Sequence, residues 1–137
     1  MSDFWDGYRY TEPLAAALSA AFGVEFALQY TGGGCVSVQA DLDEDTQVLV
    51  GSAVDGPLLR EAERLALPFQ GGFQIGIQEA RSGFALADAV DYTATSPDEV
   101  VVLLKTALEL VARHTEDTRV VWTRDVDGVV SEQIWPR

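Results

Sequence analysis

The stretch that decides the fold is VEFALQYTGGGCVSVQADL, residues 24–42. Apolar residues alternate with polar or small ones from Val24 to Tyr30 and again from Val36 to Leu42, on either side of the turn Thr31–Gly34. A period of two residues indicates a strand with one buried face. A short glycine-rich turn between two such strands favours a hairpin. The sequence therefore predicts an antiparallel pair of strands here.

The same alternation recurs downstream. A third strand is predicted over Gln47–Val54, after the acidic turn Asp43–Asp45. A fourth follows the glycine pair 71–72 as Phe73–Ile77, and a fifth runs from Phe84 to Val90 after another turn. Short turns between successive strands are typical of an antiparallel meander.

Helical spacing of apolar residues predicts three helices. The first begins at Thr11 as its N-cap and ends at Gly23. A short helix is expected over 58–66, with Arg64 pointing outward. The longest runs from Ser96 to Arg113. It opens with Ser-Pro-Asp-Glu, an N-cap followed by a proline and by a glutamate at the third helical position.

Residues 119–135 read as a C-terminal hairpin around the turn Asp127-Gly128. Residues 1–10 form an aromatic N-terminal arm. A length of 137 residues fits one domain, 1–137. The predicted fold class is α+β: an antiparallel sheet of five or more strands packs on the long C-terminal helix and the short N-terminal helix, and the hairpin is added to it.

The charge composition of the chain limits the classes of partner that it is expected to bind. The chain has 22 acidic and nine basic residues, and its net charge is −13. This charge repels phosphate backbones and anionic lipids, so we expect neither direct nucleic-acid binding nor membrane binding. It favours a protein partner with a basic surface. The N-terminus lacks the pattern of a secretory signal and no long apolar run is present, so a cytoplasmic location is expected.

Residues that might carry catalysis or bind metal give little support for either. The acidic run Asp41–Asp45 lacks the glycine and glutamate of a calcium loop, and no metal or cofactor site is predicted. Cys35 and His114 are each unique, and a nucleophilic pair of the two is kept as an alternative. Asp88 and Asp91 are expected on opposite faces of a strand. We therefore expect a protein that is not an enzyme.

One face of the predicted sheet is poor in charge. Charge-poor patches are typical of the cores of protein interfaces. The residues expected there are Gln29, Ser37, Gln39, Gln74, Gly76, Gln78, Ala85 and Ala87. Aromatic residues near the two ends are candidate interface anchors: Trp5, Tyr8 and Trp135.

The order of the segments Val24–Tyr30, Val36–Leu42, Phe73–Ile77 and Ser96–Arg113 resembles the fold of type III secretion chaperones and of the similar YbjN-type proteins. The resemblance covers roughly residues 11–114, so the C-terminal hairpin lies outside it. It implies a small, acidic, often dimeric protein that holds other proteins and catalyses nothing.

Together these features predict an acidic, non-catalytic protein-binding module, chaperone-like or inhibitor-like, that uses the charge-poor face and the terminal aromatics. A homodimer through that face is a competing use of it. Two alternatives remain open. One is an inhibitor whose carboxylates mimic nucleic acid. The other is a small-ligand domain or an enzyme that uses Cys35 and His114.

Overall fold

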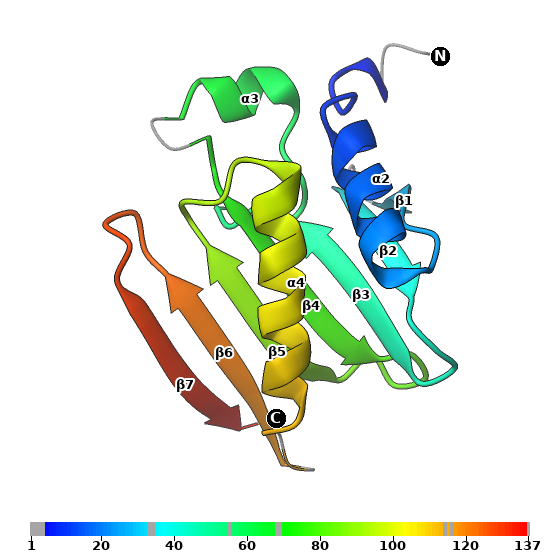
Figure 1. The fold of residues 1–137 in the computed structure, drawn as a ribbon, viewed down its shortest axis with the longest axis vertical. Coiled ribbons are helices and arrows are strands. Elements are labelled where there is room, and N and C mark those ends of the chain that lie inside the picture. The colour runs from blue at the N-terminus through cyan, green and yellow to red at the C-terminus, as the bar shows by residue number, and fades with distance from the viewer. Residues whose placement is uncertain are drawn as a thin grey trace.

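The computed structural model describes residues 5–32, 35–54, 56–67, 70–113, 115 and 117–136. This part of the chain is an α+β fold in which seven strands form one sheet, in chain order from β1 to β7 (Figure 1). The elements are α2 (Thr11–Phe22), β1 (Ala27–Gly32), β2 (Cys35–Asp41), β3 (Thr46–Gly51), α3 (Glu61–Leu65), β4 (Phe73–Glu79), β5 (Ala85–Asp91), α4 (Pro97–Val111), β6 (Thr118–Arg124) and β7 (Val130–Pro136).

The meander predicted from the alternation is confirmed, because β1 to β5 pair antiparallel with their neighbours. β5 and β6 instead run parallel, and β7 pairs antiparallel with β6. A parallel pair needs a long crossover, which α4 provides. The C-terminal hairpin therefore extends the main sheet at its edge. An alternating pattern sets which side chains are buried but not strand direction, so it did not predict the parallel pair.

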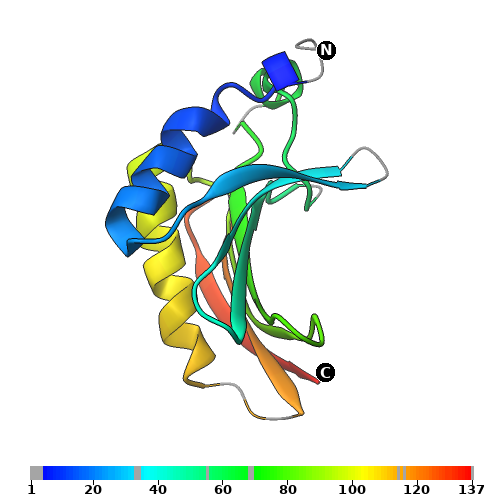
Figure 2. The same cartoon turned by 90° about the vertical axis from the view of Figure 1, so that its right-hand side faces the viewer.

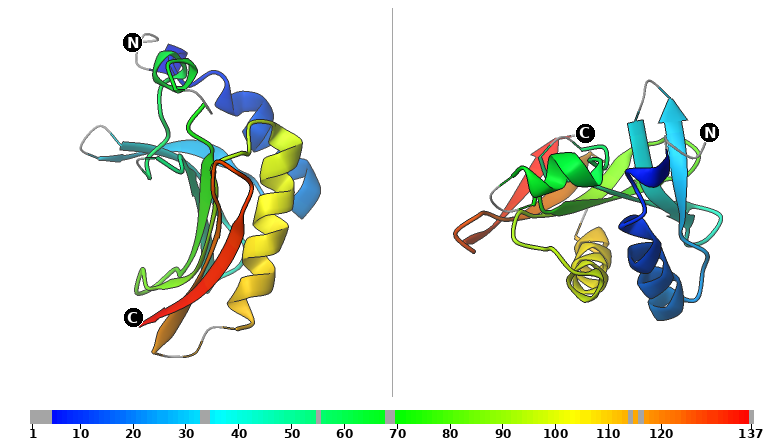
Figure 3. Two further views of the ribbon diagram at one scale, coloured as in Figure 1. Left: turned by 90° about the vertical axis from the view of Figure 1, so that its left-hand side faces the viewer. Right: turned by 90° about the horizontal axis from the view of Figure 1, so that it is seen from above.

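Both long helices lie on the same side of the sheet (Figure 3, right). Leu18 of α2 and Leu104 of α4 are completely buried against it. The sheet side chains beneath them are equally buried: Val36, Val38, Val48, Val50, Ile75 and Ile77. Seen from the side, the sheet curves so that its other face is concave, and no described helix covers that face (Figure 2).

The start of α4 has the predicted geometry. The Ser96 hydroxyl accepts a hydrogen bond from the backbone N–H of Glu99 at 3.2 Å. The Glu99 carboxylate accepts one from the N–H of Ser96, also at 3.2 Å. Each residue thus satisfies a backbone donor that the first turn leaves unpaired. Pro97 at the first helical position completes the arrangement.

Two local predictions were wrong. Tyr10, and not Thr11, is the N-cap of α2, and the buried Thr11 hydroxyl donates to the backbone carbonyl of Tyr8 at 2.6 Å. The short helix α3 spans only Glu61–Leu65, and Arg64 on it points inward. Its guanidinium lies 4.2 Å from the centre of the Tyr10 ring. This cation–π contact holds the arginine inside, and the next residue of the helix, Leu65, is 62% exposed.

Within the described residues, no helix is both long enough and apolar enough to span a lipid bilayer.

Candidate functional site

The candidate site is the concave face of the sheet, away from the helices, which we call the open face. Directly paired residues of neighbouring strands project to the same side of a sheet. Gln29 pairs with Ser37, and Gln39 pairs with Leu49. Leu49 pairs in turn with Gly76, two residues from both Gln74 and Gln78. The register therefore places all five polar residues of the predicted surface on the open face: Gln29, Ser37, Gln39, Gln74 and Gln78.

Two hollows mark the open face. The main hollow has a volume of about 410 Å³, and its floor is formed by β2, β3, β4 and β5. Its lining residues are Cys35, Val36, Ser37, Leu49, Val50, Gly51, Gly56, Pro57, Gln74, Gly76, Gln78 and Asp88. A second hollow of about 260 Å³ lies over β1, β2 and β3 and contains Gln29, Gln39 and Gln47.

Two hydrogen bonds between side chains lie where these hollows meet. The Gln39 amide donates to the Ser37 hydroxyl at 2.8 Å, and the Gln78 amide donates to the Gln47 carbonyl oxygen at 2.7 Å. A primary amide has two N–H groups and two acceptor lone pairs. Each glutamine is thus held in place by one bond and keeps further donors and acceptors for a ligand.

Asp88 supplies the charge of the main hollow. It pairs with Gly76 across β5 and β4, and a Cβ atom added at Gly76 would lie only 3.3 Å from the Asp88 Oδ1 atom. The glycine therefore leaves room for the carboxylate. The Asp88 Oδ2 atom lies 3.5 Å from the Arg119 guanidinium and, within the described residues, is buried without a hydrogen bond.

Burial raises the pKa of the Asp88 carboxyl above its usual range, because the charged form loses hydration. The positive charge of Arg119 opposes this effect without cancelling it. Perturbed carboxylates in hollows are characteristic of functional sites. Asp88 was not predicted as a site residue, because the alternation that assigns Ala85 and Ala87 to the open face puts Asp88 on the helix side.

Asp91 lies on the opposite face, as predicted from its spacing to Asp88. It pairs with Phe73 and is almost completely buried. Arg124 donates to its carboxylate at 3.0 Å, and the Thr93 hydroxyl donates at 2.6 Å. This ion pair ties the end of β5 to β6.

One residue predicted for the open face lies elsewhere. Ala87 pairs with Ile77 on the helix side and is fully buried, whereas Ala85 pairs with Gln78 on the open face. The register shifts between these two pairs, so Leu86 is an extra residue in β5. A bulge of this kind breaks the period of two, and the simple alternation then assigns Ala87 to the wrong face.

Trp135 lies on the edge strand β7 and projects to the open face. It pairs with Arg119, and the Arg119 guanidinium lies 5.6 Å from the centre of its ring. The indole N–H donates to the Gln133 side chain at 3.0 Å. Trp135, Arg119 and Asp88 thus follow one another over β7, β6 and β5, and only the fold brings them together.

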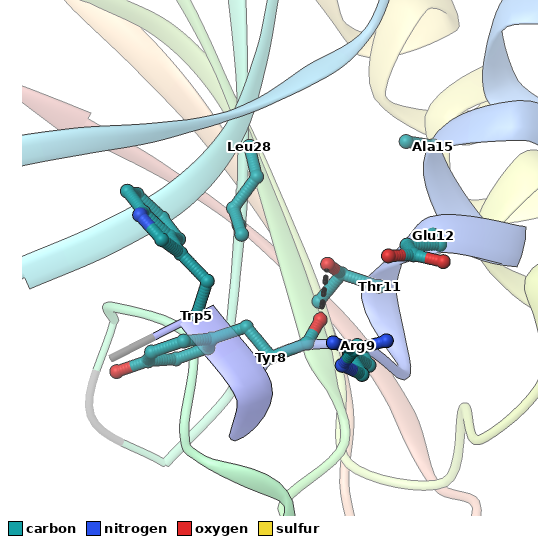
Figure 4. A pocket seen from close by; sticks show the side chains of 7 residues that line it. All are labelled: Trp5, Tyr8, Arg9, Thr11, Glu12, Ala15 and Leu28. Atoms are coloured by element: carbon teal, nitrogen blue, oxygen red, sulfur yellow. Dashed lines mark hydrogen bonds between the residues drawn. The ribbon is translucent and has the colours of Figure 1, made fainter. Parts of the chain in front are cut away.

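The two N-terminal aromatics do not reach the open face. Tyr8 is only 5% exposed, so the prediction of an accessible side chain was wrong. Trp5 is 41% exposed and lines a separate hollow of about 370 Å³ with Leu28 and Thr11 (Figure 4). Leu28 pairs with Val38, whose side chain is on the helix side. Trp5 therefore lies across the sheet from the glutamines.

Of the two remaining candidate catalytic residues, only one lies among the described residues. Cys35 lines the main hollow, whereas His114 lies outside the described residues, so their contact stays untested. Among the residues that the structure describes, no three His, Cys, Asp or Glu side chains are grouped so that they could hold a metal ion. No family model, curated protein or solved structure matches this chain.

Proposed function

We propose that this protein is a non-catalytic binding module that holds a segment of another protein on its open face, as a chaperone or an inhibitor would. The supporting observation is a concave sheet face that no described helix covers, with amide side chains at its centre. Amides both donate and accept hydrogen bonds, which suits the N–H and C=O groups of an extended chain. Sparse charge at the centre is typical of interface cores.

The charges favour a basic partner. Asp88 is the one acid that lines the main hollow, and its buried carboxylate is incompletely solvated there. A lysine or arginine side chain of the partner would compensate for the lost hydration. The net charge of −13 would speed the approach of such a partner by long-range attraction. A basic side chain docked beside Asp88 is therefore part of the proposal.

The test is a selection of random displayed peptides against the wild-type protein, followed by binding measurements on the selected peptides. Gly76→Leu fills the main hollow; the only atom within 4 Å of an added Cβ there is the Oδ1 of Asp88, which must shift slightly to admit it. Ala20→Leu introduces the same side chain at an exposed position of α2, on the other side of the sheet. Urea unfolding first establishes that both variants are folded.

We expect selected peptides to be rich in lysine and arginine, to bind Ala20→Leu like the wild type, and to lose at least about tenfold in affinity with Gly76→Leu. Their affinity should fall as salt is added. Peptides that bind both variants equally would place the interface elsewhere. A selection that enriches no sequence would contradict the proposal outright.

A small-ligand domain is a second candidate, favoured by the volume of the main hollow and the raised pKa of Asp88. Ligand sites commonly occupy about 300–1,000 Å³ and combine apolar walls with a few polar groups. A thermal-shift screen of small metabolites tests this candidate. A ligand that stabilises the wild type but not Asp88→Asn would favour it over peptide binding, and a screen without such a ligand would reject it.

A further inference from the structure

The second notable surface is the outer edge of β7. It is the last strand of the sheet, so one side of its backbone has no neighbouring strand among the described residues. All seven of its residues are exposed. In Figure 1, α4 lies over β4 and β5, and β7 lies beyond it at the margin of the sheet. An edge strand of this kind presents a row of N–H and C=O groups ready to pair.

β7 lacks most of the features that usually protect an edge. Natural edge strands carry charges, bulges or prolines that prevent pairing. Here the register with β6 is continuous over seven residue pairs, without a shift. Proline occurs only at the last position, Pro136. The single charged residue is Glu132, and its carboxylate is bound by the Arg113 guanidinium.

The side chains of β7 are unusually apolar for an exposed strand. Val130 is 49% exposed and Ile134 is 66% exposed. Both project to the helix side, because Ile134 pairs with the buried Val120 and the two positions are four residues apart. Val102 on α4 is 61% exposed on the same side of the sheet. Glu132 projects to the same side between Val130 and Ile134, because it pairs with Trp122, so this face of β7 is apolar on either side of one ion-paired carboxylate.

We propose that a second copy of this chain pairs with β7, strand against strand and antiparallel, so that two sheets become one. A two-fold axis perpendicular to the sheet relates the copies and keeps their helices on the same side. The Ile134 side chains of the two copies then lie diagonally across from each other near the two-fold axis, and Val130 of each copy faces Pro136 of the other. With Gln133 at the centre of the pairing, each Glu132 faces Ile134 of the other copy.

Self-complementarity is the reason to choose a second copy, because two identical strand edges related by a two-fold axis present matching N–H and C=O groups to each other. Two copies with a net charge of −13 repel each other, so they can meet only where the surface is nearly neutral. β7 is such a place, since Arg113 neutralises Glu132 and Arg119 lies against Trp135. A basic partner would instead be drawn to the acidic surfaces elsewhere on the molecule.

The area of the contact sets its strength. Strand pairing through one edge, with a few apolar side chains, buries less than the roughly 1,600 Å² of a standard protein interface. We therefore expect a dimer that dissociates on dilution. Salt should strengthen it, because screening weakens the repulsion between the two acidic copies.

The experiment is sedimentation velocity of the full chain over a range of protein concentrations. Ile134→Glu places a second carboxylate directly opposite Glu132 of the other copy, in the middle of the proposed contact. Leu65→Glu is the matched control, because Leu65 is 62% exposed on α3 and its replacement changes the net charge equally. Circular dichroism establishes that both variants are folded.

We expect dimers of the wild type and of Leu65→Glu at high concentration, and at least a tenfold weaker dimer for Ile134→Glu. Hydrogen exchange should show β7 amides gaining protection as the wild-type protein is concentrated. A wild type that stays monomeric at every concentration and salt level overturns the proposal, as do equal affinities of the two variants. Peptide binding to the open face is measured with other variants, so either proposal can fail alone.

Discussion

At the scale of single residues, Asp88 is the side chain of the open face whose charge is least well stabilised. Its carboxylate is largely buried, one oxygen accepts no hydrogen bond within the described residues, and its cation, Arg119, is 3.5 Å away. A charged group in such a place destabilises the free protein. A protein that keeps it despite this cost is expected to use it for binding.

The unfavourable burial of the charged Asp88 carboxylate predicts how the stability of the folded protein depends on pH. Because burial raises the folded-state pKa of Asp88 above the unfolded value, the folded protein binds the proton more tightly. The contribution of Asp88 to stability therefore falls as pH rises from the unfolded-state pKa through the folded-state pKa. Asp88→Asn should be more stable than the wild type at neutral pH, on the order of 1 kcal/mol, and this advantage should vanish in mild acid.

Urea unfolding at the two pH values measures this difference. Asp41→Asn, at the exposed end of β2, is the control and should change stability little at either pH. If Asp88→Asn is instead clearly less stable at neutral pH, the contact with Arg119 outweighs burial, and Asp88 is a structural ion pair with no spare capacity for a partner.

At the scale of elements, the entry into β4 depends on one backbone position. Gly72 has φ = +60°, and a Cβ atom there would lie 2.4 Å from the backbone oxygen of Asp91 and 2.6 Å from the Cα of Tyr92. The end of β5 therefore passes directly against the start of β4. Only glycine allows this approach.

Gly72→Ala should consequently destabilise the protein by at least about 3 kcal/mol, through backbone strain and collision together. Gly83→Ala is the matched control. Gly83 also has a positive φ, +74°, but its added Cβ would meet no atom within 4 Å. Its cost should be about 1 kcal/mol, from the left-handed conformation alone. Equal losses in urea unfolding would show that the close approach of β4 and β5 contributes nothing.

The elements also show what sequence patterns can and cannot predict. Alternation places Gln39 and Gln78 correctly, because the side-chain period of a regular strand is fixed by its geometry. It misplaces Ala87, because the extra residue Leu86 interrupts that period. Arg64 was expected to point outward and Tyr8 was expected to be an interface anchor, whereas a cation–π stack and local packing hold these two side chains inside. Contacts between distant segments, such as Trp135 with Arg119, leave no local signal.

At the scale of the whole molecule, the excess of acidic residues affects the stability of the fold as well as the choice of partner. The ion pairs of the described residues join Arg9 to Asp6, Arg113 to Glu132, Arg119 to Asp88 and Arg124 to Asp91. With 22 acids and nine bases in the chain, most carboxylates must remain without a cation. Their mutual repulsion favours expanded states over the compact one.

Added salt should therefore stabilise the folded protein, because charges separated by more than about 8 Å are screened at physiological ionic strength. We expect a gain on the order of 1 kcal/mol in urea unfolding between low and physiological salt. Glu44→Gln with Asp45→Asn removes two charges from the exposed turn between β2 and β3 and should reduce the gain. Glu44→Asp with Asp45→Glu retains both charges and should leave it unchanged.

The sign of this salt effect decides between two electrostatic descriptions of the molecule. If salt lowers the stability, the ion pairs outweigh the repulsion and the charge is balanced locally. If salt raises it, unbalanced charge dominates, and the two proposed interfaces must respond in opposite directions. Screening then weakens the capture of a basic segment on the open face and strengthens the pairing of two β7 edges. Low ionic strength would thus favour monomers that bind a basic partner, and higher ionic strength would favour dimers.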